Sequence, residues 1–217
     1  MSKKIMTVCG LIDPDSLGFT SMHEHILCDT TELRDRVAPL LPPDSPVAEE
    51  EPIRLSNVGH LKHAFVLSQD VLRMTDVETM TREVSYFKEA GGSAIVDMST
   101  PGIRCDLEGT RKISENTGVH IVAPTGIYAY DTWPDQYKEM DVQELTAYML
   151  NEVESGIEGT DISRGHIMVA LDGDQQPQEL AASLAAGGVS LDSNLRVTVH
   201  QGLVVSADQA QLIVARG

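Results

Sequence analysis

The chain has 217 residues and a formal net charge of −17, because 33 Asp and Glu residues outnumber 16 Lys and Arg. A hydrophobic fraction of 41% with 23% charged residues is ordinary for a globular domain and excludes a fibrous or wholly disordered chain. The acidity argues against a nucleic-acid partner, since phosphates would be repelled. No apolar run approaches the roughly 20 residues that span a bilayer, and no signal-peptide pattern follows the first residues. With three widely spaced cysteines, we expect a cytoplasmic protein with one domain over residues 1–217.

The first quarter of the chain combines extended segments with an irregular stretch. A strand over residues 4–12, a turn over 13–18 and a second strand over 19–25 predict a short N-terminal β-hairpin. Residues 38–56 hold five prolines among acidic residues, which predicts a loop and excludes a regular core element.

From residue 75 onward, helices alternate with short apolar strands. Thr75 and Glu78 have the spacing of a capping box for a helix that buries one face and stops at Gly91 and Gly92. The expected elements that follow are strand 93–99, helix 106–116, strand 119–124, a helix from Asp141, strand 166–171, a helix from Pro177, strand 196–200 and helix 206–215. Continuously apolar strands are typical of a parallel sheet covered by helices, so the predicted class is α/β. The sequence contains no GxGxxG motif, which argues against a dinucleotide-binding fold.

The sharpest local motif is His23-Glu24-His25, at the end of the second expected strand. Residues two apart in a strand point to the same face, so both imidazoles can reach one metal ion while Glu24 points away. The alternative is that two surface histidines flank a glutamate by chance. Imidazole nitrogen suits Zn, Mn, Fe or Co, and a metal interpretation therefore predicts a divalent transition metal.

His200 ends the last expected strand, where functional side chains gather in parallel α/β folds. It is the natural third ligand beside the histidine pair, or else a hydrogen-bonded histidine at the rim. Two other histidines, His120 and His166, start strands and are expected to be structural. Asp97 lies near the end of its strand, where it either supports the histidines as a hydrogen-bond partner or caps a neighbouring loop.

An aromatic loop follows the strand over residues 119–124. Tyr128 and Trp133 either line a substrate pocket or belong to a surface loop whose aromatic residue covers the core. The sequence leaves both interpretations open.

Several ordered blocks resemble the phosphotriesterase family of the amidohydrolase superfamily. The stretch Leu17–Ile26 is similar to the family's LGxTxxHEH signature, and Gly91–Thr100 to a GGxxIVDxT-type stretch. Further blocks follow at Thr117–Tyr128, Gly156–Ile162 and Val197–His200. Because the blocks keep their order across nearly the whole chain, the resemblance is specific in a way that a lone HxH is not.

This resemblance implies a (β/α)8 barrel of the TIM type with a binuclear metal centre at the carboxyl ends of its strands. It implies hydrolysis of a lactone, carboxylic ester or phosphotriester through a metal-bound hydroxide. His23 and His25 would hold one ion and His200 the second, with zinc the expected metal. A small-molecule substrate is the expected partner, with self-association into a homo-oligomer as a further expectation.

Two departures from the family pattern leave the function open. The position of the family's bridging lysine falls on Met168, whose thioether is a poor bridge between such ions, unless Asp172 or Asp174 takes its place. A complete barrel takes about 250 residues, so the chain is expected to be truncated after about five β/α units. The alternative to an active hydrolase is therefore an inactive homologue that acts as a metal-binding or assembly protein.

Overall fold

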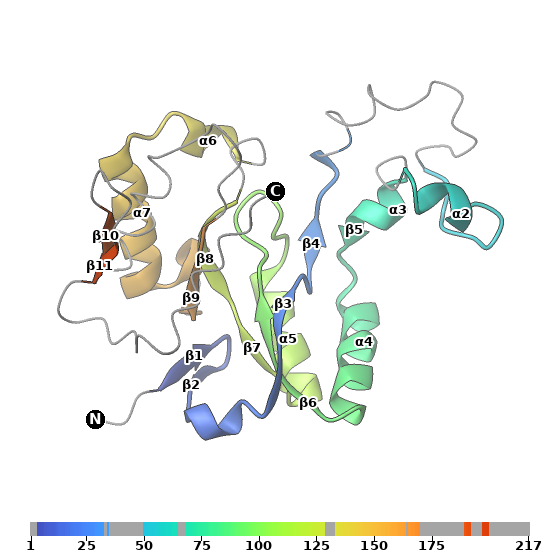
Figure 1. Cartoon of the computed structure of the whole chain (residues 1–217), viewed down its shortest axis with the longest axis horizontal. Helices are drawn as coiled ribbons and strands as arrows, with labels where there is room; N and C mark the ends of the chain where they lie inside the picture. The colour runs from blue at the N-terminus through green and yellow to red at the C-terminus, as the bar shows by residue number, and fades with distance from the viewer. Residues whose placement is uncertain are drawn as a thin grey trace.

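The centre of the molecule is a set of parallel strands, seen in a computed structural model that describes residues 4–32, 34, 50–64, 68–128, 133–163, 165–169, 189–191 and 197–199. Strand β6 (Gly92–Asp97) lies between β3 (Phe19–Glu24) and β7 (His120–Val122) and pairs in parallel with both (Figure 1). All three carboxyl ends therefore meet at one edge of the sheet.

The path of β7 continues directly into β8 (Pro124–Ile127), which pairs in parallel with β9 (His166–Val169). Between the two halves, the Ala123 carbonyl accepts a hydrogen bond of 2.9 Å from the Gly165 N–H. Strand β7 thus pairs with β6, and strand β8, which follows it directly, pairs with β9. The predicted α/β class with parallel strands is confirmed.

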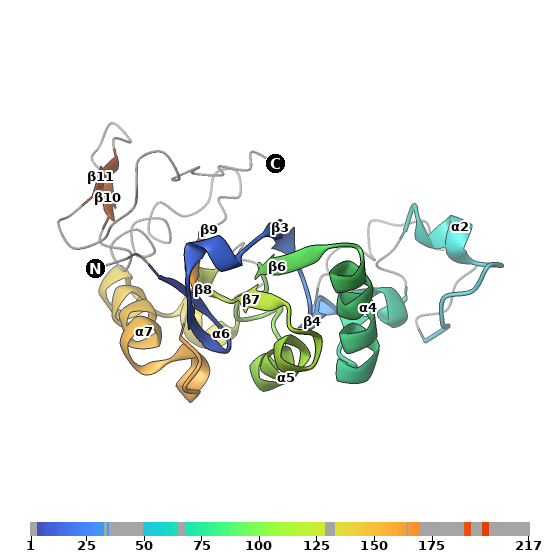
Figure 2. The ribbon, with the colours of Figure 1, turned by 90° about the horizontal axis from the view of Figure 1, so that it is seen from below.

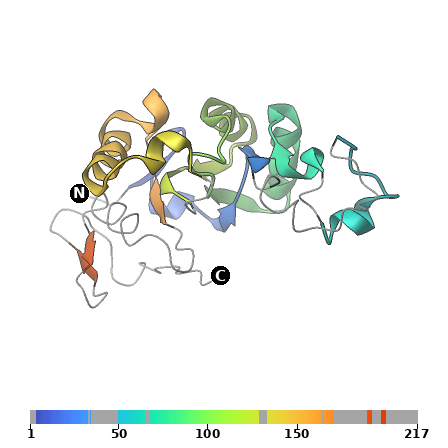
Figure 3. The same ribbon diagram turned by 90° about the horizontal axis from the view of Figure 1, so that it is seen from above.

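Three helices cover one face of these strands: α4 (Val77–Glu89), α5 (Leu107–Thr117) and α7 (Val142–Ser155). Figures 2 and 3 show them side by side on the same side of the sheet. Each begins after an aspartate whose side chain accepts a hydrogen bond from a backbone N–H of the first turn. Gly118, with a φ of 65°, ends α5 in the left-handed conformation that favours glycine.

Apolar side chains form two separate cores beneath these helices. The first joins α4 and α5 to β6 and β7 and includes Val84, Ile95, Ile113 and Ile121. The second lies between β8, α7 and the short helix α6 (Asp135–Lys138), and it consists of Ile127, Trp133, Tyr137, Leu145 and Met149. One face of α4 is buried, as predicted, because Val84 belongs to the first core and Val77, Met80 and Phe87 pack against it.

Shorter elements connect and close this framework. Strands β4 (Cys28–Asp29) and β5 (Arg73–Met74) pair antiparallel above the carboxyl end of β3. The remaining short helices are η1 (Pro14–Ser16), α2 (Val58–Leu61), α3 (Gln69–Leu72) and η5 (Ile157–Gly159). Within the described ranges, no helix is long and apolar enough to cross a membrane.

The N-terminal hairpin forms at a different place from the predicted one. Residues 4–12 are not one strand: β1 (Ile5–Thr7) turns at Val8 and Cys9 and pairs antiparallel with β2 (Gly10–Ile12). The Thr7 hydroxyl donates to the Gly10 carbonyl at 2.8 Å, and Gly10 has a φ of 107°, so the reversal is local. Strand β3 is left free to join the parallel sheet.

Two further predictions need correction. The residue that caps α4 is Asp76, whose Oδ1 accepts from the Thr79 N–H at 2.7 Å, and not Thr75. Strand β11 (Val197–Val199) pairs antiparallel with β10 (Val189–Leu191) and not in parallel with the other strands. Two strands so close in sequence can form a hairpin, which brings them together with little loss of chain entropy.

Candidate metal centre

His23 and His25 lie side by side at the carboxyl end of β3. Their ring centres are 5.8 Å apart and the rings meet edge to face, with an interplanar angle of 74°. The Glu24 carboxylate is engaged elsewhere, because its Oε1 accepts from the Ser21 hydroxyl at 2.5 Å. Two imidazoles on one ion, with metal–nitrogen bonds of about 2.1 Å, place their ring centres about 5–6 Å apart. The separation of this pair therefore fits a shared ion.

The two histidines differ in how firmly they are held. His23 is exposed, and within the described residues no hydrogen bond reaches its ring. His25 is half-buried, and its Nδ1 lies 3.1 Å from the Ser99 hydroxyl oxygen. Burial lowers the pKa of His25 from its ordinary value, and the neighbouring His23 lowers it further, although Glu24 acts in the opposite direction. The neutral imidazole that metal binding requires is therefore favoured.

Ser99 was not among the residues singled out in the sequence, although it lies two positions beyond the expected Asp97. Its side chain is fully buried, and it follows β6 on the strand's carboxyl side. A serine after an apolar strand carries no distinctive pattern. Only the pairing of β3 with β6 brings it to His25, which is 74 residues away in the chain.

Asp97 makes the loop contact that the second of its two predicted roles describes. Its carboxylate is 1% exposed and accepts from the Ser99 N–H at 2.9 Å, so it holds the start of the loop after β6. Burial raises the pKa of Asp97, while hydrogen bonds from Ser99 and Ile26 and the charge of Arg104 oppose that rise. It touches the histidine pair only through Ser99, as far as the described residues show.

The described residues do not include all of the remaining predicted ligands. His200, Asp172 and Asp174 lie outside the described residues. Met168 lies on β9 with its backbone paired to Gly126, and its side chain is outside what is described. Among the described side chains, no group of three or more His, Cys, Asp or Glu could hold a metal ion.

Two histidines expected to be structural start strands, as predicted. His120 opens β7 and His166 opens β9. His120 pairs with Ala94, near the amino end of β6, so its backbone lies away from the carboxyl end of β3. His166 pairs with Pro124, just beyond the carboxyl end of β7, so the register does not place it at the opposite edge.

The aromatic loop divides between two environments. Trp133 is 4% exposed and belongs to the second core, which is the interpretation in which the aromatic residue covers the core. Its indole Nε1 donates to the Tyr128 carbonyl at 2.7 Å. The Tyr128 side chain itself is exposed, at 38%, just beyond the end of β8.

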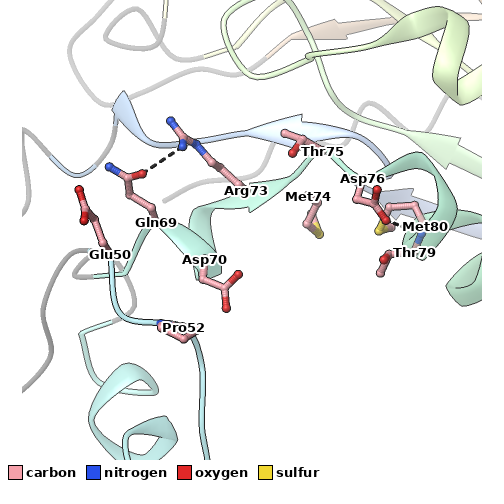
Figure 4. Close-up of a pocket in the computed structure, with 10 residues that line it drawn as sticks. All are labelled: Glu50, Pro52, Gln69, Asp70, Arg73, Met74, Thr75, Asp76, Thr79 and Met80. Atoms are coloured by element: carbon pink, nitrogen blue, oxygen red, sulfur yellow. Dashed lines mark hydrogen bonds between the residues drawn. The ribbon is translucent and has the colours of Figure 1, made fainter.

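An open hollow of about 540 Å³ lies near the start of α4, and it includes neither histidine of the pair (Figure 4). Its walls combine polar and apolar surface and come mainly from α3, β5 and the start of α4, and they include Asp70, Arg73 and Asp76. Arg73 donates to the Gln69 side chain at 3.0 Å and to Asp29 at 3.1 Å. This cation is thus already engaged by protein groups.

The fold and the histidine pair define an α/β protein with two neighbouring histidines at the carboxyl edge of its parallel strands. The chain matches the model of the Phosphotriesterase family over residues 3–207 and belongs to that family.

Two relatives illustrate the match in sequence. The chain is 34% identical over 209 residues to a phosphotriesterase-related protein of Nematostella vectensis, covering 94% of this chain and 58% of that one. It is 33% identical over 168 residues to the N-acetyltaurine hydrolase of Homo sapiens, covering 77% and 47%. The chain thus spans about half the length of these relatives.

Two solved structures share the fold of this chain. A resiniferatoxin-binding protein from Rhodobacter sphaeroides superposes with a TM-score of 0.76 at 28% identity, over 84% of this chain and 51% of that one. A lactonase from Listeria monocytogenes superposes with a TM-score of 0.63 at 23% identity, over 85% and 53%. The second likeness concerns the fold alone.

Proposed function

We propose that this chain carries a metal-binding histidine pair of a hydrolase that cleaves an ester-type bond in a small molecule. The observation that supports this most directly is the His23–His25 pair, with ring centres 5.8 Å apart at the carboxyl end of β3. In parallel α/β folds this edge of the sheet is where catalytic groups gather. The substrate classes that fit are a lactone, a carboxylic ester or a phosphotriester.

In this proposal His23 and His25 hold a divalent transition metal, with zinc the first choice and Mn, Fe or Co the alternatives. When bound, the metal would polarise the scissile carbonyl or phosphoryl group and lower the pKa of the attacking water. The residues of the chain would bind the metal and orient its ligands. His25 is held through its Nδ1 by Ser99, so its Nε2 is the nitrogen left to bind the metal. His200 is the proposed third ligand.

A second candidate activity is cleavage of the amide in N-acetyltaurine. It is supported by 33% identity over 168 residues to a protein of that name, which covers 47% of that protein. An amide carbonyl needs the same polarisation as an ester carbonyl, so the proposed site is compatible with either substrate.

The test measures bound metal and turnover on the same purified full-length chain. After removal of metal and reloading with Zn²⁺, we expect about one or two equivalents bound to the wild type, and loss of that metal in His23→Ala/His25→Ala. The matched control is His60→Ala/His63→Ala, which removes two exposed histidines near α2 and should leave the metal in place.

A panel of lactones, carboxylic esters, phosphotriesters and N-acetyltaurine then assays turnover. Metal-dependent hydrolysis that disappears in the His23/His25 variant and persists in the control supports the proposal. A wild-type chain that binds zinc but hydrolyses none of them would instead favour the metal-binding, non-catalytic alternative suggested by Met168. A folded wild type without bound zinc would overturn the metal site itself.

A further inference from the structure

We propose that Ser99 is a positioning residue that fixes the ring orientation and tautomer of His25, and so sets the metal affinity of the site. The inference rests on the proposed function, since it assumes that His25 is a ligand. Its first support is geometric, because the Ser99 Oγ lies 3.1 Å from His25 Nδ1. In the neutral imidazole, a protonated Nδ1 that donates to Ser99 leaves the Nε2 lone pair for the metal.

The second support is the way in which Ser99 itself is held. Its side chain is fully buried, and its N–H donates to the Asp97 carboxylate at 2.9 Å. Its carbonyl accepts from Arg104 Nη1 at 3.4 Å. Asp97 is 1% exposed, and so is the Arg104 side chain. A serine fixed at both backbone groups by buried charged residues can impose one direction on a histidine ring.

The third support is the position of Arg104, which is held from several directions. Its guanidinium donates to the Pro124 carbonyl at 3.1 Å and to the Glu158 carboxylate at 2.8 Å. The loop after β6 is therefore tied to β8 and to η5. These hydrogen bonds restrict the movement of the loop that holds Ser99, and the Ser99 hydroxyl in turn restricts the His25 ring. His23 receives no comparable support among the described residues, so His25 is the ligand that a partner can orient.

The experiment measures the Zn²⁺ affinity of the full-length chain by competition with a chromophoric chelator. We expect Ser99→Ala to weaken zinc binding by about 10- to 100-fold, as is typical when a hydrogen-bond partner of a metal-binding histidine is lost. Ser99→Thr keeps the hydroxyl and should restore most of the affinity. The control is Ser114→Ala, since Ser114 is also buried and its hydroxyl donates at 2.7 Å to the Val119 carbonyl, away from the histidines.

A second readout does not need metal. Nitrogen-15 NMR of the histidine rings in the metal-free wild type should show His25 protonated on Nδ1, and Ser99→Ala should shift the ring toward the Nε2-protonated form. This measurement on the wild type decides the question even where Ser99→Ala does not fold. A wild-type His25 protonated on Nε2 would overturn the inference.

The outcomes also separate this inference from the proposed function. If the wild type binds zinc and Ser99→Ala binds it as tightly as Ser114→Ala does, the positioning role is wrong while the metal site stands. If the wild type itself binds no zinc, the metal site fails and the inference fails with it. Weaker binding confined to Ser99→Ala, with recovery in Ser99→Thr, supports both.

Discussion

At Gly165 the backbone passes close to two other elements just before β9 begins. A methyl group placed there would lie 2.5 Å from the Met6 carbonyl oxygen and closer still to the Val122 side chain. The Gly165 N–H also donates to the Ala123 carbonyl, so the backbone cannot move away without loss of that bond. Because Gly165 has no side chain, the backbone can pass close to Val122 of β7 just before β9 begins to pair with β8.

We therefore expect Gly165→Ala to lower the free energy of unfolding by about 1–3 kcal/mol, the usual cost of forcing extra volume into a packed site. Chemical denaturation monitored by circular dichroism measures the loss. The control is Gly59→Ala, because Gly59 lies in the short helix α2 with no atom near the added methyl group. Alanine favours helix over glycine, so this control should be neutral or gain up to about 1 kcal/mol. Equal stabilities of the two variants would contradict the packing argument.

The histidine pair shows how much of the site can be predicted at the scale of single residues. Alternation along a strand predicted that His23 and His25 share one side, and their ring centres lie 5.8 Å apart in the structure. Ser99 could not be predicted in this way, because its contact with His25 joins the ends of two different strands. Trp133 was equally open, since an aromatic loop residue has no pattern that separates a pocket from a core.

At the scale of elements, Asp29 connects the small β4–β5 pair. Its Oδ1 accepts from the Thr31 N–H at 3.0 Å and from the Thr31 hydroxyl at 2.7 Å, and its Oδ2 accepts from Arg73 Nε at 3.1 Å. Burial acts to raise the pKa of Asp29, but the hydrogen bonds from Thr31 and the cation of Arg73 outweigh it and lower that pKa. The charged carboxylate is thus the form that stabilises this pair of strands.

A folded-state pKa below the unfolded value of about 3.9 stabilises the protein above that value, and the contribution disappears as the pH falls through the folded pKa. We therefore expect Asp29→Asn to be less stable than the wild type at pH 6, with a difference that shrinks toward pH 3. Urea denaturation of both proteins at the two pH values measures it. A difference that stays the same at pH 3 would show that charge is not the cause.

The longer elements were predictable because their signals are local. Aspartates at the helix starts and glycines at the ends fix the limits of α4, α5 and α7 within a few residues. The predicted capping residue of α4 was one position too early, because Thr75 and Asp76 are both good capping residues. In the structure the cap is Asp76. The pairing of β1 with β2 was missed because a turn at Val8 and Cys9 lacks strong turn residues.

At the scale of the whole molecule, buried polar groups join the two hydrophobic cores. Glu152 of α7 is 1% exposed and accepts hydrogen bonds from the Thr125 hydroxyl and, at 2.6 Å, from the Tyr148 hydroxyl. Its Oε1 lies 4.0 Å from Arg104 Nη2, which also binds Glu158. Arg104 comes from the loop between β6 and α5, beside the first core, whereas Glu152 adjoins the second.

Removing Arg104 would leave buried acceptors without their cation, and this is the costly way to break a buried pair. We expect Arg104→Ala to lower the free energy of unfolding by about 3–5 kcal/mol. Arg82→Ala, on the exposed face of α4, is the control and should change it by less than about 0.5 kcal/mol. Thermal or urea unfolding compares the two, and similar small losses would show that the two cores do not depend on this link.

The sequence by itself determined the α/β class, the order of the main elements α4, β6, α5, β7, α7 and β9, the family, and the spacing of two histidines two positions apart at the end of a strand. These features depend on periodicity, capping residues and ordered motifs, which act over a few neighbouring positions. Only the tertiary structure decided that Ser99 contacts His25, that Asp97 reaches the pair only through Ser99, that Trp133 is buried, and that Arg104 links the two cores. Each of these depends on which distant element lies alongside, and no local pattern encodes that choice.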